Sequence, residues 1–158
     1  YCKYTVNPAV RIPLKSLVYH DCHISGWYTG DGVSKIMEHW RTKDLLTLLY
    51  GAMNLVFPSD IEFWEKYKDK FLWSIKVTGL VLENIGYEEM QRHDFLSSDG
   101  LVQKTQFSNG VQIIVNFSGS TFFYDKFPIP AKDFIILRGD RVYTSDVITA
   151  ELSLKNNK

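Results

Sequence analysis

The sequence predicts an α+β protein in which a strand, a loop and helices precede an antiparallel β-sandwich. In the first half of the chain, apolar residues recur at three- and four-residue steps, the period of an amphipathic helix. From about residue 88 onward the period changes to two, as in strands with one buried face. We therefore divide the chain into residues 1–86 and 87–158.

The first predicted element is a strand over residues 14–20. This short apolar run is rich in β-branched and aromatic residues and fits a buried strand of a parallel sheet, whose two faces are both covered. Pro8 and Pro13 mark an irregular segment before it. Residues 21–34 contain three glycines and predict a loop that is long enough to have a function.

Two helices are predicted next. Thr42 can cap the first, which has leucines at 45, 46, 48 and 49 and ends near Gly51. Residues 58–60 open the second, and Gly86 ends it. The predicted apolar face of the second helix consists of Ile61, Trp64, Tyr67, Phe71, Ile75, Thr78 and Leu82.

A β-hairpin is the clearest prediction in the second half. Residues 101–107 and 111–117 flank Asn109-Gly110, a dipeptide that supplies the positive φ angles of a tight turn. Further strands are expected at 134–137 and 142–154, with turns at 98–100 and 138–140 and an edge or bend near Pro128 and Pro130. The residues expected in the sandwich core are Val111, Ile113, Val115 and Phe117.

Composition excludes several classes of function. The 158 residues contain 18 basic and 18 acidic side chains, so we expect no nucleic-acid partner and no anionic membrane surface. No apolar run reaches the roughly 20 residues of a spanning helix. Because phosphate-cradling and dinucleotide motifs are absent, no cofactor is expected. Cys2 and Cys22 leave a single bridge open, although buried free thiols are favoured.

The densest polar cluster of the sequence is Tyr19-His20-Asp21-Cys22-His23. If it ends a parallel strand, it lies where α/β proteins bind ligands. On an extended segment His20 and Cys22 point one way while Asp21 and His23 point the other, so no metal site is predicted. A purely structural strand end and a Cys22 nucleophile with a histidine base are alternatives.

Aromatic and acidic residues also meet in the predicted loop. Trp27 and Tyr28 precede Asp31, and sugars need apolar faces for their rings and acceptors for their hydroxyls. Asp21 and Asp31 would act as a glycosidase pair only at about 5–10 Å from one another. Turn chemistry alone also explains Asp31 between two glycines. Asp125 and Asp133 are interpreted as solvated loop charges.

Several blocks of the sequence together carry a family resemblance. They are Arg11-Ile12-Pro13-Leu14, Leu17-Val18-Tyr19-His20-Asp21-Cys22, Trp27, Gly30-Asp31, Lys43-Asp44-Leu45, Leu48-Leu49-Tyr50-Gly51, Gln103-Lys104-Thr105-Gln106-Phe107-Ser108-Asn109-Gly110-Val111, Val115-Asn116-Phe117 and Ile129-Pro130-Ala131-Lys132-Asp133-Phe134. These blocks cover most of the chain, and the Tyr-His-Asp-Cys block is the most distinctive. They resemble glycoside hydrolases related to the endo-α-N-acetylgalactosaminidases and their exo-acting relatives.

The resemblance implies that residues 1–86 are the end of a catalytic (β/α)₈ barrel and residues 87–158 its C-terminal β-domain. The family's nucleophile and general acid lie on earlier strands, so no catalytic residue is expected here and the isolated chain is predicted to be inactive. Sugar contact is implied for His20, Asp21, Trp27 and Asp31. The chain departs from the family pattern at residues 52–55 and at Ser25-Gly26.

The expected partners are therefore a glycan or glycoside and the remainder of a parent chain. The start at Tyr1, with no signal-peptide pattern, predicts a segment cut from a longer protein, and a secreted or periplasmic location is favoured. A carbohydrate-binding or architectural β-module with a helical adaptor is the alternative. An independent small enzyme that uses Cys22 with His20 or His23 is a third reading.

Overall fold

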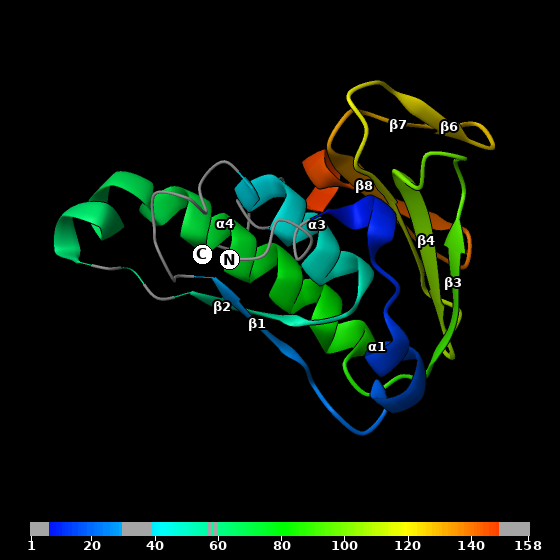
Figure 1. Cartoon of the computed structure of the whole chain (residues 1–158), viewed down its shortest axis with the longest axis horizontal. Helices are drawn as coiled ribbons and strands as arrows, with labels where there is room; N and C mark the ends of the chain where they lie inside the picture. The colour runs from blue at the N-terminus through cyan, green and yellow to red at the C-terminus, as the bar shows by residue number, and fades with distance from the viewer. Residues whose placement is uncertain (1–6, 30–38, 57, 59, 149–158) are drawn as a thin grey trace.

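The computed structural model of the chain describes residues 7–29, 39–56, 58 and 60–148. Figure 1 shows helices in the middle of the molecule, with a short parallel sheet along one side and an antiparallel sheet at one end. The mixed α+β class is thus confirmed. Within the described part of the chain, no helix is long and apolar enough to cross a membrane.

The N-terminal segment is helical where a strand was predicted. A 3-10 helix, η2 (Pro8–Val10), leads into the α-helix α1 (Leu14–Tyr19). The strand prediction for residues 14–20 is therefore wrong. This segment is not paired with any described strand, so its backbone groups pair locally, and His20 N donates to Ser16 O at 3.1 Å. None of the six residues of α1 is buried.

A parallel strand–helix–strand unit follows. Strand β1 (Gly26–Thr29) pairs in parallel with β2 (Met53–Val56), and helix α3 (Trp40–Leu49) connects them. The prediction of a loop for residues 26–29 is wrong. The strand was missed because its two aromatic residues lie between glycines and do not form a long apolar run. Helix α3 begins at Trp40, before Thr42, and ends at Leu49, near Gly51 as predicted. The φ of Gly51 is +61°.

The second predicted helix is confirmed as α4 (Ile61–Ile85). Asp60 caps it by accepting from Phe63 N at 2.7 Å, and Gly86 follows its last residue. Its buried face differs from the predicted one, since Ile61 and Ile75 are 74% and 43% exposed. The first turns of α4 extend beyond the described sheets (Figure 1), so no described strand packs against the apolar residues there. The residues that are buried are Phe71, Ser74, Val77, Thr78, Val81 and Ile85.

The second half forms the predicted antiparallel sheet. Its five strands are ordered β3-β4-β5-β8-β9, and a separate hairpin joins β6 to β7. The turn between β4 and β5 contains Gly110 at φ +82°, as the Asn-Gly signal predicts. The bounds are β3 (Met90–Phe95), β4 (Val102–Phe107), β5 (Gln112–Asn116), β6 (Phe122–Tyr124), β7 (Phe127–Ile129), β8 (Asp133–Arg138) and β9 (Arg141–Thr144).

The last predicted strand is shorter than expected. Strand β9 ends at Thr144 and residues 145–148 form a helical turn, while the rest of the predicted strand lies outside the described residues. Pro128 lies in β7, which belongs to a two-stranded hairpin. Because β7 is an edge strand, the missing N–H of Pro128 does not interrupt the hydrogen bonds of a central strand.

One hydrophobic core lies between the helices and the antiparallel sheet. The predicted core residues of β5 and its flanks are confirmed, since Ile113, Val115 and Phe117 are fully buried and Val111 is 2% exposed. Leucines of α3 and the second half of α4 complete this core, which is continuous across the boundary drawn at residue 86. In place of a second large sheet, the β6–β7 hairpin covers the opposite face and buries Ile114.

Candidate functional site

His20 lies inside the molecule, at the point where α1, α3 and the start of the antiparallel sheet meet. Its side chain is 4% exposed, and its Nδ1 and Nε2 lie 2.7 Å from Glu88 O and 3.1 Å from Gly51 O. The ring also packs on Phe107, with the ring centroids 5.0 Å apart. Both ring nitrogens thus face backbone carbonyls. Through them His20 links the end of α1 to the turn after α3 and to the segment between α4 and β3.

Gly51 has two reasons to be glycine. Its φ of +61° is a conformation that side chains rarely adopt, and a Cβ atom there would lie 2.2 Å from His20 Nε2. The sequence predicted only the first reason, as a helix stop. The second depends on the buried position of His20.

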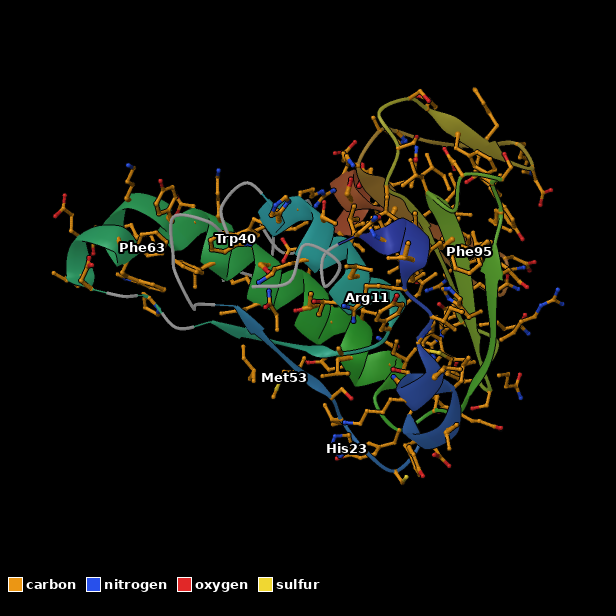
Figure 2. All side chains as sticks on the ribbon, viewed as in Figure 1. Arg11, His23, Trp40, Met53, Phe63 and Phe95 are labelled. Carbon is orange, nitrogen blue, oxygen red and sulfur yellow. The ribbon has the colours of Figure 1, made fainter. Side chains whose placement is uncertain are left out.

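Asp21, Cys22 and His23 are exposed on the turn after α1. Figure 2 shows His23 beside the beginning of β1. The premise that this cluster follows the C-terminal end of a parallel strand is therefore wrong, because the turn precedes the parallel strand β1. Cys22 is exposed rather than buried, with Sγ 3.5 Å from Tyr19 O, and no bond to a histidine is present. Cys2 lies outside the described residues.

Trp27 is the predicted site residue that lies in the parallel strands. Trp27 is in β1 and pairs with Asn54 of β2, while Asp31 follows β1 by two residues and lies outside the described part. Because β1 and β2 run in parallel, their C-terminal ends at Thr29 and Val56 share one edge. Parallel α/β units bind ligands at that edge. Among the described residues, His20 is buried and Asp21 lies on the turn before β1, at the opposite end of the strand from this edge.

A buried polar cluster that sequence reasoning did not identify connects α3, β2 and α4. Asp44 Oδ1 accepts hydrogen bonds from Ser74 Oγ at 2.5 Å and Asn54 Nδ2 at 3.2 Å. All three side chains are at most 9% exposed. Burial raises the pKa of Asp44 to about 7, although the Ser74 hydrogen bond and the charge of Arg41 act in the opposite direction. The sequence feature that could have indicated this cluster is the position of Asp44 directly before a run of leucines.

Arg41 joins the helices to the antiparallel sheet. Its Nη2 lies 2.6 Å from Asp133 Oδ1, its Nε donates to Lys132 O at 2.8 Å, and its guanidinium lies 4.9 Å from the Trp73 ring centroid. Ser145 Oγ donates to the other carboxylate oxygen of Asp133 at 2.7 Å. The interpretation of Asp133 as a solvated charge is wrong, because its side chain is 17% exposed and ion-paired.

No group of three or more histidine, cysteine, aspartate or glutamate side chains within the described ranges could hold a metal ion. The described residues contain two candidate features for a functional site. One is the buried Asp44 cluster between the parallel strands and the helices, and the other is the strand edge formed by Thr29 and Val56. The first stabilises the strand–helix–strand unit. The second is the position at which a ligand could be contacted.

Comparison with protein-family models finds no match, and no curated protein matches the chain. Among solved structures, the chain resembles alpha-N-acetylgalactosaminidase NagBb from Bifidobacterium bifidum. The quadruple mutant gives 24% identity and a TM-score of 0.50, over 77% of this chain and 17% of that chain. The ligand-free form gives 24% and 0.48 over the same shares, and the GalNAc complex gives 22% and 0.45 over 78% and 18%. The chain thus has the fold of one section of that glycoside hydrolase and spans 17% of its length.

Proposed function

We propose that the chain is the C-terminal part of a glycoside hydrolase, formed by the end of its catalytic barrel and the β-domain that follows. In this role it contributes sugar contacts, while the catalytic carboxylate pair belongs to the rest of the parent enzyme. The observation that carries the proposal is the parallel β1–β2 pair, which helices cover on one face and nothing described covers on the other. The sequence resemblance and the likeness in fold point the same way.

Two parallel strands make an incomplete sheet. Parallel sheets are found with both faces covered, and fewer than three strands give little independent stability. Asn54 points toward α3 and α4, where it bonds Asp44 and Ser74. Its neighbour Met53 alternates to the opposite face and is 42% exposed, on the side away from the helices (Figure 2). Further parallel strands beside this pair would bury that face, as a closed barrel does.

Within this proposal, the sugar is contacted from the C-terminal edge of β1, through Trp27 and Asp31. An indole covers the apolar face of a pyranose, and a carboxylate accepts hydrogen bonds from neighbouring hydroxyls. His20 acts by positioning the chain, since both of its ring nitrogens are engaged with carbonyls. Asp21 precedes β1, at the opposite end of the strand, so a sugar at the C-terminal edge would not reach it.

The two aspartates make a matched test in the full-length parent enzyme. With an aryl α-N-acetylgalactosaminide as substrate, Asp31→Asn should lower kcat/KM by at least about tenfold, equivalent to ~1.4 kcal/mol. Trp27→Ala should mainly raise KM, because stacking is equal in the ground and transition states. Asp21→Asn should change neither constant. Melting temperatures identify variants that are misfolded.

Three outcomes would contradict parts of this proposal. Losses in Asp21→Asn with none in Asp31→Asn would move the sugar contact to the turn before β1. Wild-type kinetics in all three variants would remove the sugar-contact role. Glycan binding by the isolated chain, undiminished without the barrel, would favour a carbohydrate-binding β-module instead.

A further inference from the structure

A cavity of about 190 Å³ opens on the side of the molecule where α4 meets the antiparallel sheet. It lies against the second half of α4, strand β8, strand β9 and the helical turn at 145–148. The lining residues are Leu80, Val81, Asn84, Val111, Ile136, Arg138, Tyr143 and Ile148. These residues are remote in sequence from those proposed for sugar contact, so an inference about this cavity is independent of the proposed function.

The floor of the cavity is apolar and is formed by residues of the main hydrophobic core. Val81, Val111, Ile136 and Ile148 are 2–8% exposed and belong to the main hydrophobic core. An enclosed cavity of about 150 Å³ lined by aliphatic and aromatic side chains accepts benzene. The floor of this more open cavity has similar aliphatic walls. A compact apolar group of that size therefore fits the floor.

The rim supplies one strong polar group. Arg138 shares a sheet face with Ile136, two positions earlier, and its Nη1 donates to Asn84 Oδ1 at 2.6 Å. That partner is neutral, and no described carboxylate forms an ion pair with Arg138. In the β8–β9 register Arg138 lies directly opposite Arg141, and like charges in this position repel each other. An anion at the rim would be attracted by the positive charge of Arg138.

We propose that this cavity is a binding site for a small carboxylate with a compact apolar body. The apolar part occupies the floor formed by Val81, Val111 and Ile136. The carboxylate meets the guanidinium of Arg138, whose planar fork matches two carboxylate oxygens. The side chain of Tyr143, which pairs with Ile136 across the strands, forms the remaining wall.

Benzoate, benzyl alcohol and benzylamine are suitable probes, because they share a ring and differ in the charge of the head group. Titrated into the full chain and followed by amide chemical shifts, benzoate should bind saturably below about 10 mM, and the other two at least about tenfold more weakly. Arg138→Gln should remove this preference for benzoate. Arg92→Gln, an equal charge change on the far edge strand β3, should leave it intact.

A space-filling variant tests the floor separately. Val81→Phe should abolish binding of all three probes, and if it does not fold, Leu80→Trp at the wall replaces it. The proposal is overturned if benzoate does not saturate, if the three probes bind equally, or if Arg92→Gln weakens benzoate as much as Arg138→Gln does. Shift changes that map away from β8 and the end of α4 would also overturn it.

Discussion

Replacing Asp44 with asparagine should make the stability of this protein much less dependent on pH. The carboxyl is buried between α3, β2 and α4, and burial raises its pKa from 3.8 to about 7. Because the native state holds this proton more tightly than the unfolded chain does, the stabilising contribution is complete below pH 3.8. It is lost as the pH rises through about 7.

The size of the effect follows from the shift. A difference of about three pKa units corresponds to ~4 kcal/mol, and this is an upper value because the structure relaxes around a buried charge. Asparagine at position 44 can still accept from Ser74 and Asn54 but cannot ionise. Above about pH 7 the Asp44→Asn protein should therefore be more stable than the wild type by ~1–4 kcal/mol, and near pH 4 the two should be similar.

Urea unfolding followed by tryptophan fluorescence, from about pH 4 to about pH 8, measures this difference. Asp125→Asn is the matched control, because Asp125 is exposed in the turn between β6 and β7 and its φ of 51° suits asparagine. The control should follow the wild-type pH profile. If the stabilities of the wild type and Asp44→Asn changed with pH in parallel, the reasoning would be refuted. The carboxyl of Asp44 would then have the same pKa in the native and the unfolded state.

Three further predictions concern the core, a glycine and activity. Val115→Ala removes methyl groups from a fully buried site and should lower the free energy of unfolding by ~1–3 kcal/mol, measured in urea; no loss would place Val115 outside the core. Gly51→Ala should cost more than Gly139→Ala, which has a similar φ but open space around it, and equal melting temperatures would argue against the contact with His20. The isolated chain should not hydrolyse aryl glycosides, because two opposed carboxylates are needed. Turnover that survives purification and is lost in Asp21→Asn would make Asp21 catalytic.

The sequence was most informative where local chemistry decides the structure. The Asn109-Gly110 hairpin and the stop at Gly51 rest on positive φ angles that few residues adopt, and the Asp60 cap rests on a side chain that accepts from Phe63 N. Period-two alternation likewise identified which residues of β5 and its flanks face the helices, although the opposite face of the strand is also buried, under the β6–β7 hairpin. These features could be predicted from a short window of residues, without knowing what packs against it.

The tertiary structure decided what each apolar segment contacts. Residues 14–20 have the composition of a buried strand, yet they are helical here, because a strand needs neighbours that no local pattern can supply. The buried face of α4 differs from the predicted one, since several helical rows of apolar residues share the same spacing and only the facing sheet selects among them.

The candidate site depended on the same information. His20 was predicted to contact a ligand from its place in a polar cluster, but its burial against Gly51 O and Glu88 O arises from residues 31 and 68 positions away. The Asp44 cluster and the cavity beside Arg138 also combine elements that are distant in sequence. The sequence by itself determined turns, caps and strand periodicity, which depend on local backbone energetics. The tertiary structure alone decided which polar groups are buried, because burial depends on long-range packing.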